Sequence, residues 1–72
     1  MNTSENLQNL FLNTVKDQEM PVTISLTNGF QFRGVITEFD DSVILLEADK
    51  KLSMIYKLSV ASITPGKMIK ID

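Results

Sequence analysis

The side chains that most enzymes use for catalysis are scarce in this chain. Its 72 residues include no Cys and no His, so no conventional pair of a nucleophile and its base can be assembled. Thiolate and imidazole metal sites are excluded for the same reason. Asp40 and Asp41 are adjacent carboxylates, but successive residues rarely converge on one metal ion or substrate, and no glycine-rich phosphate loop is present. The sequence therefore predicts a binding protein that is not an enzyme and holds no metal or cofactor.

One short stretch combines aromatic, amide and basic side chains. Phe30 and Phe32 are two residues apart and would share one face of a strand, whereas Gln31 and Arg33 would share the other. The rings could stack on a ligand or fill a core, and the residues alone leave both interpretations open. The formal net charge of −2 argues against a general polyanion binder. It does not exclude a few cations gathered at one site, especially a site repeated by symmetry.

These side chains must be positioned by a helix and several short strands. The spacing predicts an amphipathic helix over residues 5–17, which ends before Met20-Pro21 because the residue preceding a proline favours extended geometry. Its apolar stripe consists of Leu7, Leu10, Phe11 and Val15. Residues 22–27 then alternate with the period of a half-buried strand. Asn28-Gly29 predicts a hairpin turn because both residues tolerate positive φ.

The rest of the chain reads as further strands joined by tight turns. A second strand runs over residues 30–39, with Gly34 permitting a sharp bend or close backbone packing. The apolar run 43–46 predicts a strand that is covered on both faces. The residues from 52 to 58 alternate, with an apolar face made of Leu52, Met54, Tyr56 and Leu58. A last strand covers residues 61–64.

One helix followed by five short strands predicts a mainly β fold, a strongly bent antiparallel barrel that stays open. A chain of 72 residues buries only about 60% of its unfolded surface, so we expect oligomerisation to stabilise it. Pairing of unlike open edges can close into a ring. No membrane-spanning stretch and no signal-peptide pattern are present, so the predicted location is the cytoplasm, away from membranes.

Several segments, taken in order, closely resemble the bacterial Hfq family of Sm-like RNA chaperones. They are Leu7-Gln8, Phe11-Leu12-Asn13, Asn28 to Gly34, Phe39-Asp40, Val43 to Leu46 and Ile55-Tyr56-Lys57. The resemblance covers residues 5–65 and implies an Sm-like domain over residues 1–65, followed by a short tail at 66–72. It also implies a homohexameric ring in which strand four of each subunit pairs with strand five of the next. The implied partner is single-stranded RNA, including small regulatory RNAs and messengers.

The same resemblance assigns RNA-binding residues to three surfaces. On the distal face, which favours adenine-rich RNA in the family, the matching residues are Gly29, Phe30, Gln31, Phe32, Arg33 and Ser62. On the proximal face, which binds uridine around the central pore, the matching residues are Gln8 and Lys57. At the rim the matching residue is Lys16.

The chain also departs from the family pattern at each surface. Ser25 stands where a distal-face aromatic would stack on a base, so we expect weakened but retained adenine binding. On the proximal face Asp41 replaces Gln, Ser42 replaces an aromatic and Leu58 replaces His, which predicts poor uridine binding. The rim stretch 16–19 carries one positive and two negative charges, so we expect it to be nearly inactive toward RNA.

Three functional hypotheses remain open at this point. The first is an Hfq-type ring that binds adenine-rich RNA and acts in post-transcriptional regulation. The second is an Hfq-like ring with weakened RNA affinity that serves as a protein-interaction or modulatory subunit, as the acidic pI near 4.9 would suit. The third, a monomeric SH3-like peptide binder, is disfavoured because one Tyr and no Trp leave little for an aromatic groove.

Overall fold

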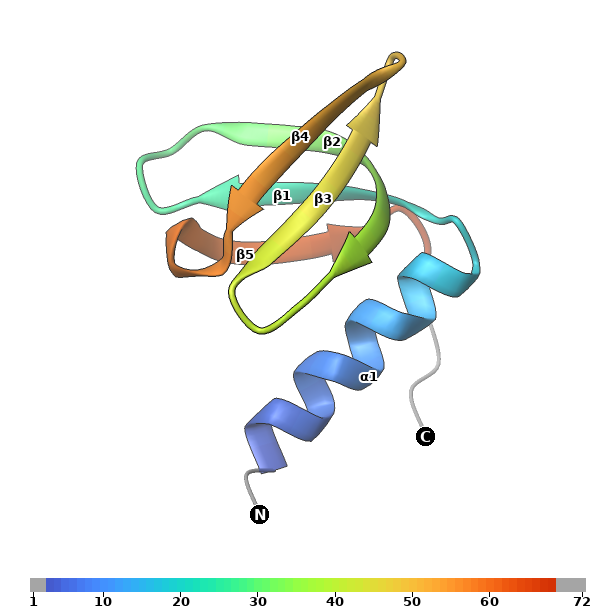
Figure 1. The fold of residues 1–72 in the computed structure, drawn as a ribbon, viewed down its shortest axis with the longest axis vertical. Helices are drawn as coiled ribbons and strands as arrows, with labels where there is room; N and C mark the ends of the chain where they lie inside the picture. The colour runs from blue at the N-terminus through green and yellow to red at the C-terminus, as the bar shows by residue number, and fades with distance from the viewer. Residues whose placement is uncertain (1–2, 69–72) are drawn as a thin grey trace.

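The computed structural model describes residues 3–68, so positions 69–72 of the predicted tail lie outside the described residues. The elements are α1 (Thr3–Asp17), β1 (Pro21–Leu26), β2 (Gln31–Phe39), β3 (Val43–Ala48), β4 (Lys51–Tyr56), the 3-10 turn η1 (Lys57–Ser59) and β5 (Val60–Pro65). The strands form one antiparallel sheet in the order β4-β3-β2-β1-β5 (Figure 1). The predicted helix and bent, open five-stranded sheet are confirmed, with the helix starting at Thr3 rather than at residue 5.

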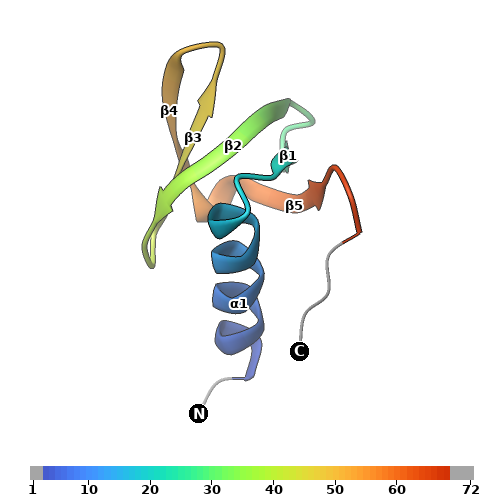
Figure 2. The same cartoon turned by 90° about the vertical axis from the view of Figure 1, so that its right-hand side faces the viewer.

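The sheet bends sharply along β2, so that the β3–β4 hairpin rises away from β1 and β5 (Figure 2). Gly34 lies on this strand, and a Cβ atom there would overlap the carbonyl oxygen of Glu47 on β3. The predicted close packing at Gly34 is therefore confirmed. Farther along, the pairing of β2 with β3 shifts between Ile36 and Glu38, which leaves a bulge at Thr37. Bulges of this kind increase strand twist and help an antiparallel sheet to curl.

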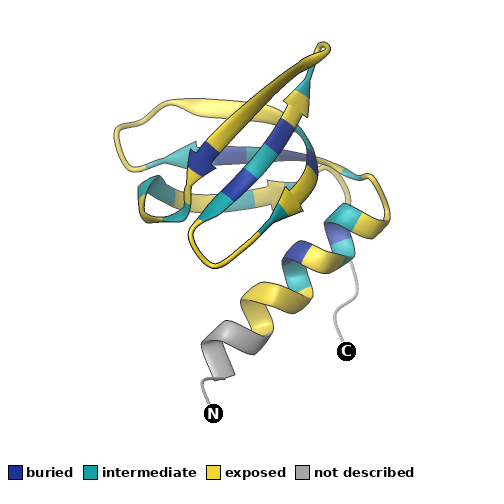
Figure 3. Cartoon of the chain, viewed as in Figure 1, coloured by how far each residue is buried: buried dark blue, intermediate teal, exposed yellow. Residues whose placement is uncertain are grey.

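The core is small and lies between the concave side of the sheet and the second half of α1. Its buried members are Leu12, Val15, Val22, Ile24, Ile36, Ile44, Leu46 and Ile55. Of the predicted helical stripe only Val15 is buried, whereas Leu7 and Leu10 are exposed. The first half of the helix extends past the sheet, so its apolar residues do not reach the core (Figure 3). Leu12, which the sequence analysis did not place in the stripe, packs in the core.

The apolar face of β4 is exposed in the subunit. Leu52, Met54 and Tyr56 are all more than half exposed, while Ile55, from the opposite face, is buried. The strand ends at Tyr56, and Leu58 belongs to η1 rather than to the strand. These side chains are exposed because β4 is an edge strand and its hairpin projects beyond the core (Figure 3). On β3, Ile44 and Leu46 are buried but Val43 and Leu45 are partly exposed. Only one face of this strand is therefore fully covered in the subunit, whereas the sequence predicted that both would be.

The turns of the β1–β2 and β3–β4 hairpins differ in type. After β1, the N–H of Gly29 donates to the carbonyl of Leu26 (3.0 Å), and Gly29 alone has positive φ (95°). The predicted hairpin is confirmed, but Asn28 keeps negative φ and its Oδ1 accepts a hydrogen bond from the N–H of Phe30 (3.0 Å). Between β3 and β4, Asp49 and Lys50 both have positive φ, as a two-residue turn requires.

Among residues 3–68, no helix is both long and apolar enough to cross a membrane.

Candidate nucleic-acid interface

The convex side of β5, β1 and β2 carries a row of polar side chains. Ser25 of β1 pairs with Gln31 of β2 and with Ser62 of β5, and directly paired residues point to the same side of a sheet. The Gln31 amide donates to the Ser25 hydroxyl (Nε2–Oγ 3.3 Å). Arg33, two residues after Gln31 in the strand, projects from the same side. The structure therefore brings Gln31, Arg33 and Ser62 onto one surface, which we call the convex face.

Phe30 and Phe32 lie on the other side of β2, near the turn. Phe32 pairs with Ile24, a buried core residue, yet its own side chain is 42% exposed and that of Phe30 is 68% exposed. The interpretation that both rings belong to the subunit core is therefore wrong. Gly29 sets their position because its positive φ turns the chain into β2.

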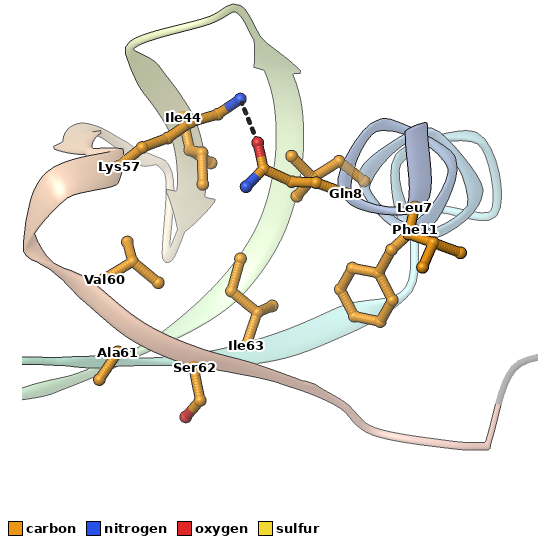
Figure 4. Close-up of a pocket in the computed structure, with 10 residues that line it drawn as sticks. Leu7, Gln8, Phe11, Ile44, Lys57, Val60, Ala61, Ser62 and Ile63 are labelled. Atoms are coloured by element: carbon orange, nitrogen blue, oxygen red, sulfur yellow. Dashed lines mark hydrogen bonds between the residues drawn. The ribbon is translucent and has the colours of Figure 1, made fainter. Parts of the chain in front are cut away.

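The predicted proximal residues meet across a cavity between α1 and β5. Its volume is about 500 Å³, and its lining includes Leu7, Gln8 and Phe11 from the helix and Lys57, Val60 and Ile63 from the end of the chain. Lys57 Nζ donates to Gln8 Oε1 at 3.1 Å, although 49 residues separate the two (Figure 4). Val60 and Ile63 point toward this space, whereas the Ser62 hydroxyl points away from it (Figure 4). Gln8 and Lys57 thus form one polar pair above an apolar hollow.

The ring of Phe39 lies close to both Lys57 and Lys16. Its ring centre is 5.4 Å from Lys57 Nζ and 5.8 Å from Lys16 Nζ, within the range of cation–π attraction. Lys16 also forms an ion pair with Glu38 (Nζ–Oε1 3.5 Å). Sequence reasoning missed Glu38 because the pair joins positions 22 residues apart, on elements whose relative placement only the tertiary fold sets.

Asp40 organises the turn that carries the altered proximal positions. Its Oδ1 accepts hydrogen bonds from the N–H groups of Ser42 (2.8 Å) and Val43 (2.9 Å). These two bonds hold the pKa of the Asp40 carboxyl below its ordinary value of 3.8; desolvation opposes them and the charge of Lys57 assists. The carbonyl of Ser42 in turn accepts from the Lys57 N–H (2.9 Å), so this turn anchors the start of η1. These contacts make Asp40 a structural residue of this turn.

The family model described as Hfq protein matches residues 7–70 of the chain. The chain belongs to the Hfq family. The RNA-binding protein Hfq of Clostridium acetobutylicum is 49% identical over 67 residues, which span 93% of this chain and 83% of the relative. The RNA-binding protein Hfq of Clostridioides difficile is 48% identical over 71 residues, which span 97% and 83%.

Solved structures of the family agree with this assignment. A crystal structure of the pleiotropic translational regulator Hfq has a TM-score of 0.80 and 37% identity, covering 82% of this chain and 98% of the other. An Hfq protein from Anabaena sp. has a TM-score of 0.70, with 85% of this chain and 95% of the other covered. At 24% identity, the Anabaena structure supports the fold alone.

Three of the four departures from the Hfq pattern occupy exposed positions, and the fourth, Ser25, is partly exposed. Asp41 and Ser42 are exposed in the turn after β2, and Leu58 is 96% exposed on η1, next to Lys57. A fully exposed leucine offers no hydrogen bond where the family pattern has an imidazole. Ser25 lies in the middle of the convex face, between Gln31 and Ser62. None of these four side chains belongs to the buried core.

Proposed function

We propose that this chain is the subunit of a ring-shaped RNA-binding protein of the Hfq type, and that its convex face binds single-stranded adenine-rich RNA. Family membership supports RNA binding, because the relatives are named RNA-binding protein Hfq. The observation that carries the choice of face is the gathering of Gln31, Arg33 and Ser62 on one side of the sheet. Phe30 and Phe32, next to Gln31 in the sequence, are also exposed. The expected partners are small regulatory RNAs and messengers in the cytoplasm.

Each of these side chains has a distinct role in the proposal. The Phe30 ring stacks on a base, an interaction worth roughly 1–3 kcal/mol. The Gln31 amide presents both donors and an acceptor to a base edge, after giving up its 3.3 Å hydrogen bond to Ser25. The Arg33 guanidinium pairs with a phosphate, and the Ser62 hydroxyl adds a further polar contact. Gly29 shapes the turn that presents Phe30.

Assembly into a homohexamer is part of the same proposal. β4 and β5 are the two edges of the described sheet, and β4 exposes Leu52, Met54 and Tyr56 along one face. Pairing β4 of one copy with β5 of the next would cover this apolar row and extend the sheet around the ring. The repeated convex faces would then bind one RNA strand several times over, which raises a weak affinity per subunit. The Sm-like domain of residues 1–65 would form the ring, with residues 66–72 as a short tail.

The proximal side of the proposed ring would bind uridine poorly. Gln8 and Lys57 supply one polar pair and one positive charge per subunit. Beside them Leu58 is exposed and apolar, and Asp41 adds a negative charge. Neither side chain can stack on a base, the leucine offers no hydrogen bond, and the carboxylate repels phosphate. At the rim, Lys16 is already paired with Glu38, which fits the expectation of a nearly inactive surface.

A second candidate function is an Hfq-like ring with weakened RNA affinity that acts as a protein-interaction or modulatory subunit. The observation in its favour is the serine at position 25, since this place in the middle of the convex face would hold a stacking aromatic in the family pattern. Loss of one stacked base per subunit would cost roughly 1–3 kcal/mol at each repeat.

The two candidates are separated by fluorescence anisotropy of labelled oligo-A and oligo-U with the full chain at one fixed salt concentration. Hfq-type function predicts that oligo-A binds more tightly than oligo-U, and that Phe30→Ala and Arg33→Ala each weaken oligo-A binding about tenfold. Lys50→Ala, which removes a charge in the β3–β4 turn, serves as the matched control for Arg33→Ala and should leave binding nearly unchanged. Equally feeble binding of both RNAs, insensitive to Phe30→Ala, would favour the modulatory subunit.

A further inference from the structure

The only basic residue of the helical segment is Lys16, in its last turn, and its charge is already engaged within the subunit. Its Nζ lies 3.5 Å from Glu38 Oε1 and 5.8 Å from the centre of the Phe39 ring. The Lys16 side chain is 27% exposed, while that of Glu38 is 66% exposed. The carboxylate therefore stands on the solvent side of the pair. A phosphate approaching Lys16 from solution would meet this negative charge.

The bulge in β2 accounts for the position of Glu38. Pairing passes from Ile36–Leu46 to Glu38–Leu45, with Thr37 as the extra residue. Without the extra residue Glu38 would pair with Ile44 and point toward the core, because side chains alternate along a strand. With it, Phe39 faces the core side opposite Ile44, and Glu38 stays in solvent within reach of Lys16. The contact is therefore fixed by backbone geometry as well as by opposite charge.

We propose that Glu38 is a built-in competitor of RNA phosphate for Lys16, and that it keeps this helix–β2 flank closed to RNA. A carboxylate offers the same kind of oxygen acceptors to a lysine ammonium as a phosphate does. An exposed ion pair contributes little to folding stability, so Glu38 has a small role in stability and a local role in repelling the backbone of RNA. The proposal rests on the RNA-binding function proposed above. Blocking by Glu38 can be distinguished from a general shortage of positive charge, because removing this one carboxylate should restore phosphate binding at Lys16.

The test uses Glu38→Gln in the full chain and a labelled 16-nucleotide oligo-C. Because this RNA contains neither adenine nor uridine, its binding reports mainly on contacts to the phosphate backbone. Anisotropy at low salt should show about threefold to fivefold tighter binding than wild type. The plot of log affinity against log salt should steepen by about 0.7 for each new phosphate contact. Thermal unfolding should be nearly unchanged, which excludes a gain that comes from misfolding.

Two variants make the outcome specific. Asp49→Asn removes one negative charge in the same chemical way at the β3–β4 turn, at the opposite end of the molecule from α1 (Figure 1). It should produce no comparable gain. Adding Lys16→Gln to Glu38→Gln should abolish the gain. An equal gain from Asp49→Asn, a gain that persists without Lys16, or no gain from Glu38→Gln would each overturn the proposal.

Oligo-A measured with the same proteins separates failure of this inference from failure of the proposed function. Oligo-A binding by wild type together with unchanged oligo-C binding by Glu38→Gln rejects only the role of Glu38. Absence of oligo-A binding by wild type together with the Lys16-dependent gain in Glu38→Gln rejects the adenine-binding face and retains the role of Glu38.

Discussion

Among single residues, Asp40 shows how one carboxylate sets the shape of an exposed turn. Its hydrogen bonds from the N–H groups of Ser42 and Val43 fix the turn after β2, and that turn supports the start of η1 through Ser42 and Lys57. The lowered pKa means that the folded state holds the charged form more strongly than the unfolded chain does. Stability from Asp40 is therefore complete above its ordinary value of 3.8 and is lost as the pH falls through the lowered folded-state pKa.

This linkage predicts a pH-dependent difference between wild type and Asp40→Asn. The asparagine keeps an acceptor oxygen for the turn but cannot titrate. At neutral pH the variant should unfold at a lower temperature than wild type, and the difference should shrink as the pH is lowered below 3.8. Circular dichroism melting curves across this range measure the effect. Asp41→Asn is the control, since within the described residues the Asp41 carboxylate accepts no hydrogen bond; an equal pH effect there would contradict the assignment.

Ser25 is the residue at which the convex face departs most from the family pattern. Ser25→Tyr places an aromatic ring between Gln31 and Ser62, and one stacked base should tighten oligo-A binding about tenfold. Ser25→Leu is the matched control, because it also removes the hydroxyl that accepts from Gln31 but cannot stack. Anisotropy with oligo-A compares the three proteins. Equal affinities for the Tyr and Leu variants would mean that RNA does not stack at this position.

On the scale of elements, β2 does the most to shape the molecule, because it bends at Gly34 and bulges at Thr37. Gly34→Ala puts a methyl group against the carbonyl oxygen of Glu47 and the side chain of Ala48. We expect a loss of about 1–3 kcal/mol in the free energy of unfolding, measured by urea denaturation. Gly66→Ala is the control, since its added Cβ would meet only the carbonyl oxygen of Pro21, at 3.3 Å. A Gly34 variant as stable as the Gly66 variant would contradict a close approach of β2 and β3.

The elements also mark how far the sequence could predict this structure. The alternation of residues 22–27 and the glycines at positions 29 and 34 depend on local geometry, so the strands, the first hairpin and the bend were predicted correctly. The spacing of apolar residues predicts which side chains share a face of a helix or strand, but it does not predict whether that face is buried in the core. The row on β4 and the start of the α1 stripe were therefore read as ordinary amphipathic faces, although both are exposed.

The candidate site was predictable to a similar degree. Strand period placed Gln31 and Arg33 together. The resemblance assigned Gln8 and Lys57 to one face, and the two side chains form a hydrogen bond in the structure. The Lys16–Glu38 contact depends on how α1 packs beside a bulged strand, and no local pattern in the sequence encodes it. Residues far apart in the sequence could therefore be placed together only where the family resemblance assigned them to the same face.

On the scale of the whole molecule, the exposed face of β4 points to assembly. Met54 is 54% exposed and pairs with Leu45, which is itself only partly covered. An apolar row along an edge strand invites pairing with another chain. Among the side chains that the structure describes, eight are buried in the core, and so small a core leaves a chain of this length in need of further burial. Burial of the exposed β4 row against a neighbouring copy would add to the small core of the subunit.

Met54→Glu separates folding from assembly. Because Met54 is exposed in the subunit, the change should cost the isolated fold little, but a charge buried against the β5 edge of a neighbour would cost several kcal/mol. We expect wild type to sediment as a hexamer and Met54→Glu to sediment as smaller species with an unchanged circular dichroism spectrum. Thr37→Glu adds the same charge at the exposed bulge of β2 and should keep the size of wild type. A wild type that sediments as a folded single copy would reject the ring, and with it the repeated convex face that makes a weak subunit site sufficient for RNA.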